Sequence, residues 1–114
     1  MPSDRISLAI ADIIEHAQLA LEFVGGQSWQ ALVKDKRTWL AIVRCLEIVS
    51  EASRRMPIPL KEKYPQIQWK QIAGAGNIYR HGYDAVDAET VVSTVTDDLP
   101  ALLRVMRDAQ TTAW

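Results

Sequence analysis

Cysteine is almost absent from this chain of 114 residues, and its scarcity limits the chemistry that the protein can hold. A single cysteine, Cys45, can form neither an intramolecular disulfide nor a thiolate zinc site. Its apolar neighbours favour a packed core thiol over a nucleophile, because a buried thiol is inert. We therefore expect a reducing, cytoplasmic environment.

Long hydrophobic runs are missing as well. No apolar stretch approaches the roughly 20 residues that span a bilayer, and the N-terminal sequence MPSDRISLAI lacks the regions of a signal peptide. We expect a soluble protein with no membrane association. Glycine and proline number only five each, which leaves no room for a disordered tract, so we expect one domain over residues 1–114 with its own core.

The chain has no large excess of either charge. A net charge of −1 argues against a general nucleic-acid binder. The charges are unevenly distributed, however, because residues 34–80 carry ten Lys or Arg and only four Asp or Glu. This basic middle indicates either a face suited to phosphates or solvated helix faces whose charges mix in three dimensions, and both interpretations stay open.

Strand signals are absent, since no segment alternates strongly and no Asn-Gly or Asp-Gly hairpin turn occurs. Apolar residues instead recur at helical spacing. They predict helices over residues 3–24, 28–35, 36–56, 69–82 and 87–109. A proline-rich connector, residues 57–68, has room for one helical turn. The fold class is therefore predicted to be all-α, most simply an up-down bundle of four main helices.

Helix boundaries are predicted from residues that start or stop helices. Gly25 and Gly26 should end the first helix, and Ser28 should cap the second. Asp87 is the expected N-cap of the last helix. Pro100 lies inside that helix, which predicts either a kink or a junction of two shorter helices, and we favour the kink.

The stretch AGAGNIYRHGYD, residues 73–84, places two glycines and several polar side chains in one predicted helix. A glycine in a helix interior costs about 1 kcal/mol relative to alanine. Gly74 and Gly76 therefore indicate close approach of another backbone or of a ligand.

The polar residues that follow these glycines suit phosphate chemistry. Asn77 and His81 are four residues apart and would share one helix face. A histidine transfers a proton near neutral pH, and Arg80 beside it could bind a phosphate. The alternative is a helix C-terminus at which Arg80 and His81 cap free carbonyls while Tyr79 and Tyr83 pack nearby.

Several motifs along the chain carry a family resemblance. In order they are Glu51-Ala52, Trp69 to Gly74, Asn77, His81 to Tyr83, Val86-Asp87 and Asp98 to Pro100. Their order and spacing resemble the HepT-like branch of the HEPN family over nearly the whole chain. The resemblance implies a helical bundle that dimerises around the motif-bearing helix. It also implies a metal-independent ribonuclease that is the toxin of a toxin-antitoxin pair, with RNA as substrate and no cofactor.

The resemblance also assigns a partner and residue roles. The usual partner is a minimal nucleotidyltransferase, the MNT antitoxin. His81 matches the catalytic histidine, Asn77 matches the polar residue after the family's arginine, and Tyr83 matches the tyrosine that the partner can modify with AMP. Glu51 lies on the helix beside the motif.

One position departs from the family pattern. Counting back five residues from His81 gives Gly76, where the family has arginine. Arg80 is one possible substitute, and Arg44, Arg54 and Arg55 are others, from the neighbouring helix or from the other subunit. The first hypothesis is therefore a ribonuclease acting at a dimer cleft. The second is a catalytically silent HEPN module that binds a nucleotidyltransferase or nucleotides, and a purely structural dimerisation domain is a third. A Gly76→Arg variant should gain activity under the first hypothesis only.

Two further sets of ionisable residues have simpler explanations. Asp12 and His16 have a spacing that could chelate a metal, but one such pair is a weak signal, so we expect no metal. Glu47 and Glu51 could be read as paired carboxylates, but Arg44, Arg54 and Arg55 lie within four residues of one or the other, which predicts ion pairs within the helix.

Overall fold

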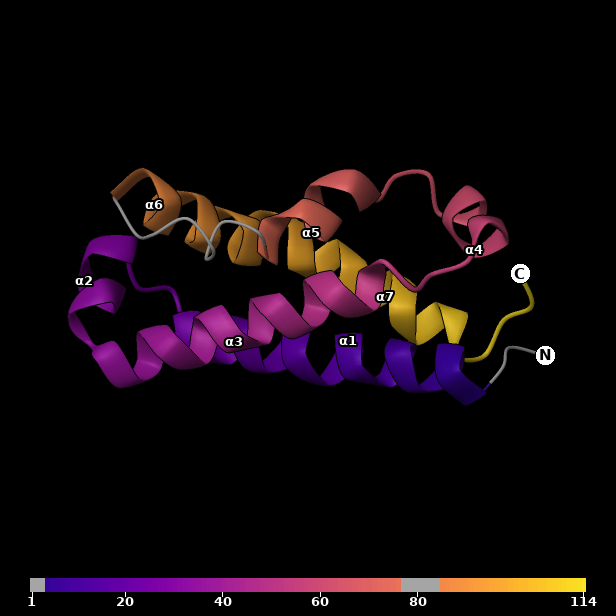
Figure 1. Ribbon diagram of the computed structural model, residues 1–114, viewed down its shortest axis with the longest axis horizontal. Coiled ribbons are helices and arrows are strands. Elements are labelled where there is room, and N and C mark those ends of the chain that lie inside the picture. Colours follow the sequence, from indigo (N-terminus) through magenta and orange to yellow (C-terminus); the bar gives the residue numbers. More distant parts are fainter. Residues whose placement is uncertain (1–3, 77–84) are drawn as a thin grey trace.

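The structure, a computed structural model, describes residues 4–76 and 85–114, and every element in these ranges is a helix (Figure 1). The elements are α1 (Asp4–Val24), α2 (Trp29–Lys34), α3 (Lys36–Ser53), α4 (Ile58–Lys63), α5 (Trp69–Ala75), α6 (Ala85–Ser93), the π-helical η2 (Thr94–Asp98) and α7 (Leu99–Ala109). The all-α prediction is confirmed. None of these helices has both the length and the apolar character needed to span a membrane.

The two longest helices, α1 and α3, run side by side along the long axis of the molecule (Figure 1). Each buries one apolar face, because its apolar residues recur every three or four positions. The fully buried side chains at their contact include Ile10, Ile13, Ile42, Leu46 and Val49. This pair forms the frame on which α7 packs against α1 and α5 packs against α3.

The last helical segment continues through Pro100 by changing its hydrogen-bond pattern. Directly before the proline, the five residues of η2 form a π-helix, in which the Leu99 N–H donates to the Thr94 carbonyl, five residues back. Pro100 then occupies the first turn of α7, the part of a helix in which proline is tolerated. The predicted interruption is therefore a π-helical segment within one helical path from Ala85 to Ala109.

Several predicted boundaries are confirmed. Gly25 and Gly26 follow α1 with φ of 53° and 76°, a backbone conformation that favours glycine. The Ser28 hydroxyl accepts a hydrogen bond from the Ala31 N–H at 3.2 Å, as a helix cap does.

Other boundaries differ from the prediction. The α3 helix ends at Ser53 instead of Met56, because the Met56 N–H turns back to the Ser53 carbonyl. The last segment begins at Ala85, so the expectation that Asp87 is its N-cap is wrong. The α5 helix begins at Trp69 as predicted and ends at Ala75, whereas the prediction extended it to Gly82; residues 77 to 82 lie outside the described residues.

Candidate functional site

The predicted site residues Asn77, Arg80, His81 and Tyr83 lie outside the described residues. The structure does describe Gly76, the residue directly before them, at the C-terminal end of α5. There α5 packs on α3, and four residues make the contact that we call the α3–α5 junction: Ser50, Arg54, Ala73 and Gly76. This junction is therefore the described part of the structure that directly precedes the predicted site in the sequence.

The contacts around Gly76 explain why a glycine stands at this position despite its cost to helix stability. A Cβ placed on Gly76 would lie 2.9 Å from Ser50 Oγ, 3.0 Å from Ser50 Cβ and 3.6 Å from the Cα of Glu47. The predicted close approach is thus confirmed for Gly76, where the tight contact is with the Ser50 side chain and the α3 backbone lies at ordinary van der Waals distance. Gly74 differs, since nothing lies within 4 Å of a Cβ placed there.

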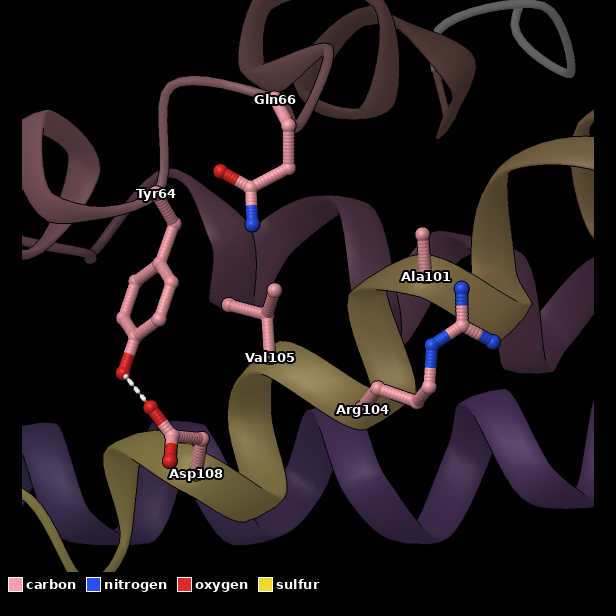
Figure 2. A pocket seen from close by; sticks show the side chains of 6 residues that line it. All are labelled: Tyr64, Gln66, Ala101, Arg104, Val105 and Asp108. Atoms are coloured by element: carbon pink, nitrogen blue, oxygen red, sulfur yellow. Dashed lines mark hydrogen bonds between the residues drawn. The ribbon is translucent and has the colours of Figure 1, made fainter.

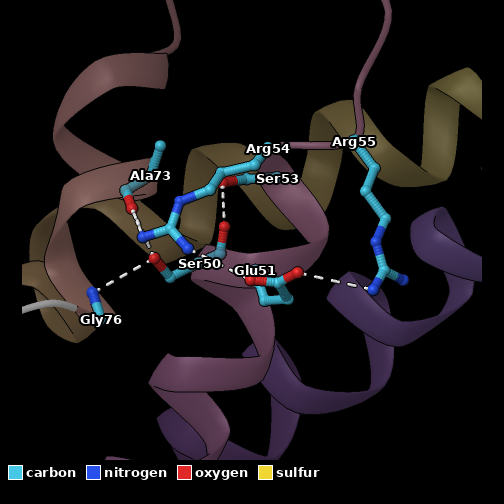
Figure 3. A network of polar contacts seen from close by, with 7 residues as sticks. All are labelled: Ser50, Glu51, Ser53, Arg54, Arg55, Ala73 and Gly76. Carbon is cyan, nitrogen blue, oxygen red and sulfur yellow. Dashed lines mark hydrogen bonds and ion pairs between the residues drawn. The ribbon is translucent and has the colours of Figure 1, made fainter.

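The hydroxyl of Ser50 joins the two helices at this point (Figure 3). It donates to the Ala73 carbonyl at 2.7 Å and accepts from the Gly76 N–H at 3.2 Å. Ser50 is only 1% exposed, so both bonds are shielded from water. The last carbonyls of a helix have no partner within the helix, and Ser50 supplies one for α5.

Arg54 reaches the same carbonyl from one turn further along α3. Its Nη2 donates to the Ala73 oxygen at 2.6 Å, and its Nη1 lies 3.1 Å from Glu51 Oε2. Arg55 pairs with the other oxygen of Glu51 at 3.5 Å and points away from α5 (Figure 3). The predicted ion pairs of Glu51 are confirmed, whereas among the described residues no ion pair joins Glu47 to Arg44. Of these two arginines, only Arg54 is brought to the junction.

Arg44 stays apart from this group. It is exposed on α3 ten residues before Arg54, about 15 Å along the helix axis. Within the described parts of the chain, no hydrogen bond or ion pair joins Arg44 to α5. Arg54 is therefore the arginine of α3 whose contacts place it beside the end of α5.

A second link holds α5 from its other side. Gln71 Nε2 donates to Asp98 Oδ2, in the π-helical segment, at 3.0 Å. Burial raises the pKa of Asp98, and the neighbouring negative charge of Asp97 raises it further. The seven residues of α5 are thus tied both to α3 and to η2.

Comparisons with known proteins place the chain in a family. A model of the family described as ribonuclease HepT-like matches residues 13–109. The chain belongs to the HepT-like ribonuclease family. The match takes in α3, α5 and the last helical path, and hence the whole α3–α5 junction.

Named relatives of this HepT-like chain are similar over most of their length. The "Probable ribonuclease HepT" of Thermococcus cleftensis is 34% identical over 93 residues, which cover 82% of this chain and 84% of the relative. The "Putative RNase MJ1216" of Methanocaldococcus jannaschii is 32% identical over 102 residues, which cover 90% and 84%. No solved structure matches the chain.

A pocket of about 270 Å³ opens elsewhere on this HepT-like fold (Figure 2). It is lined by Tyr64, Gln66, Ala101, Arg104, Val105 and Asp108. The Tyr64 hydroxyl donates to Asp108 Oδ2. Burial of the ring raises the pKa of Tyr64 to about 12, helped by this hydrogen bond and by the negative charge of Asp108. The lining comes from the α4–α5 connector and α7, so the pocket is separate from the junction.

In the structure, Glu15 lies beside Asp12 and His16, the two possible metal ligands on α1. Ligand atoms of Asp12, Glu15 and His16 lie within 4.8 Å of one another. His16 Nδ1 lies 2.8 Å from the Asp12 carbonyl oxygen, a hydrogen bond within the helix. Exposed carboxylates grouped in this way are common without an ion, and we assign no metal to them.

The sequence analysis did not identify Ser50 as a site residue. The sequence did contain a signal for this residue. Ser50 lies on the apolar side of α3, where the helical pattern predicts a hydrophobic residue. A buried serine opposite a glycine of another helix indicates close contact, but the sequence does not show which glycine lies opposite.

Proposed function

We propose that this chain is the toxin of a toxin-antitoxin pair and a metal-independent endoribonuclease. The active form is a homodimer whose cleft is lined by both copies of residues 76 to 84. Its antitoxin is a minimal nucleotidyltransferase. The observation that carries the proposal is membership of the HepT-like ribonuclease family across residues 13–109.

In this proposal the residues after Gly76 carry the chemistry. His81 acts as general base or acid on the ribose 2′-hydroxyl, which a histidine can do near neutral pH. Arg80 holds the scissile phosphate, and Asn77 orients one of these groups. Tyr83 is the residue that the partner modifies with AMP.

The α3 helix brings a positively charged side chain, Arg54, to the end of α5. Arg54 binds the Ala73 carbonyl, so its guanidinium lies about one helical turn from the position where the family's arginine is missing. Glu51 pairs with both Arg54 and Arg55 and so restrains them. We propose that Arg54 and Arg80 together replace the positive charge that Gly76 lacks.

The tight packing of Gly76 favours a second candidate function. The contacts at this glycine leave no room for even a Cβ, so an arginine here would have to displace Ser50 or α3. A catalytically silent module, which binds a nucleotidyltransferase or nucleotides, accounts for a site without that arginine. The same contacts make Gly76→Arg a poor test of activity, because the substitution changes the packing as well as the charge.

RNA cleavage by purified protein tests the proposed function. Wild type and His81→Ala are incubated with labelled RNA in EDTA, which silences contaminating metal-dependent nucleases. We expect cleavage by wild type and a loss of at least about 100-fold in His81→Ala, the usual range for removal of a general acid or base.

The controls separate loss of chemistry from loss of fold. Circular dichroism and the mass in solution should be the same for both proteins. An inactive His81→Ala variant that is unfolded supports a capping role for His81 instead. Absence of cleavage by folded wild type contradicts the ribonuclease proposal and favours the binding module, which co-purification with a minimal nucleotidyltransferase then tests.

A further inference from the structure

A buried hydroxyl holds the end of α5 from which the predicted site begins. Ser50 Oγ uses both its donor and its acceptor on α5, donating to the Ala73 carbonyl and accepting from the Gly76 N–H. The next residue along the chain is Asn77, the first residue of the proposed site. The Ser50 hydroxyl thus contacts the backbone of the residue directly before Asn77.

The fit around this hydroxyl is close. A Cβ on Gly76 would come within 2.9 Å of Ser50 Oγ, so the serine fills the space that the glycine leaves. Arg54 donates to the same Ala73 oxygen, and a carbonyl oxygen has two lone pairs for two such donors. Both donors come from α3, so the end of α5 is fixed relative to α3.

We propose that Ser50 is a positioning residue of the ribonuclease site, whose hydroxyl fixes the end of α5, directly before Asn77 in the sequence, relative to α3. This inference rests on the proposed function. Catalytic groups must lie close to their productive geometry, and a misplacement of about 1 Å can lower a rate about 100-fold. Ser50 does not touch the reacting atoms in this proposal and acts through the backbone of Gly76.

A matched control is available in Ser53, three residues later on the same helix. Ser53 is also 1% exposed, but its hydroxyl donates to the Ser50 carbonyl at 2.7 Å and so stays within α3. Ser50→Ala and Ser53→Ala each remove one buried hydroxyl from α3. Only Ser50→Ala removes the bonds to α5.

Steady-state cleavage of one labelled RNA compares the two variants in EDTA. We expect Ser50→Ala to lower kcat at least about 10-fold with KM within about 2-fold of wild type, because substrate contacts remain while the reacting groups move. Ser53→Ala should leave both constants within about 2-fold. Equal kcat values for the two variants overturn the positioning role while the ribonuclease proposal stands.

Amide hydrogen exchange gives a readout that does not depend on activity. We expect exchange at the Gly76 N–H to be at least about 10-fold faster in Ser50→Ala than in Ser53→Ala, because this amide loses its acceptor on α3 and keeps only the Gly74 carbonyl, two residues back. Unchanged exchange in Ser50→Ala overturns the inference. If wild type cleaves no RNA, the proposed function fails, and faster exchange then still supports the hydroxyl as the group that fixes α5. Should Ser50→Ala not fold, Ser50→Cys, whose thiol is a weak donor, takes its place with the same expectations.

Discussion

At Gly76 a missing side chain has two consequences, one for packing and one for chemistry. Without a Cβ, the end of α5 can approach α3 closely enough for its N–H to bond the Ser50 hydroxyl. The same absence leaves Gly76 without the arginine that the resemblance implies at this position. In the proposed function, Arg54, which α3 brings to the junction, supplies part of the positive charge instead.

Alanine substitutions should separate the two glycines of α5. Gly76→Ala forces a Cβ against Ser50 and should lower the free energy of unfolding by about 1–3 kcal/mol, as overpacking does. Gly74→Ala meets no atom within 4 Å and should raise it by about 0.4–1 kcal/mol, because alanine loses less backbone entropy on folding. Urea unfolding followed by circular dichroism measures both changes.

Gly74→Ala is the control, because it adds the same methyl group to the same helix two residues away. Equal changes in the free energy of unfolding for the two variants would contradict the close contact between Gly76 and α3. A stabilised Gly76→Ala variant would contradict it more strongly.

Among the elements, the connector between α4 and α5 is tied down by polar contacts at both ends. The Tyr64 hydroxyl bonds Asp108 of α7, and Trp69 Nε1 donates to the Tyr64 carbonyl at 3.1 Å. Tyr64 is 6% exposed whereas Asp108 is exposed, so the bond between them is partly shielded from water. The connector, and with it the start of α5, is therefore held against α7.

Tyr64→Phe should reveal this link through its pH dependence. The pKa of Tyr64 in the folded protein, about 12, exceeds its ordinary value of 10.0. The stabilisation from the protonated hydroxyl is therefore complete below pH 10 and is lost as pH rises through about 12. We expect Tyr64→Phe to lower the free energy of unfolding by about 1–3 kcal/mol at neutral pH, and the difference from wild type to shrink above pH 10.

Thr112→Val is the matched control for this measurement. Thr112 Oγ1 donates to the other oxygen of Asp108 at 3.3 Å, and threonine does not titrate. Its effect on the free energy of unfolding should stay constant between neutral pH and pH 11. A constant difference for Tyr64→Phe over the same range would contradict the assigned pKa shift.

For the whole molecule, the dimensions of one chain give a reference for assembly. The chain measures 44 × 24 × 23 Å and has a radius of gyration of 14.0 Å. A compact chain of this length is expected to have a radius of gyration of about 13 Å. One copy is thus close to the size of a compact monomer, and a dimer must be clearly larger.

The proposed homodimer predicts a mass in solution of twice 12.8 kDa and a radius of gyration well above 14.0 Å. Light scattering coupled to size-exclusion chromatography measures the first quantity, and small-angle X-ray scattering measures the second. A mass of 12.8 kDa at micromolar concentration would contradict the dimer cleft. Cleavage by such a monomer would show that one copy of the site is sufficient.

The sequence by itself determined the helical fold and most helix positions, because these depend on local signals. Apolar residues at a spacing of three or four define the buried faces of α1 and α3, and Gly25 and Ser28 mark helix boundaries without reference to distant residues. Motifs in the sequence also identified the family and named the proposed catalytic residues. Such motifs lie within short segments and can be read without a structure.

Only the tertiary structure decided which residues of α3 meet the end of α5. Ser50 lies 23 residues before Ala73 and 26 before Gly76, and no local pattern pairs residues at such separations. The tertiary structure also decided that Arg54 is the arginine that hydrogen-bonds to α5. The order of Arg44, Arg54 and Arg55 in the sequence does not say which of them faces α5. The physical reason is that helix formation follows from neighbouring residues, whereas contacts between helices follow from how their buried faces pack.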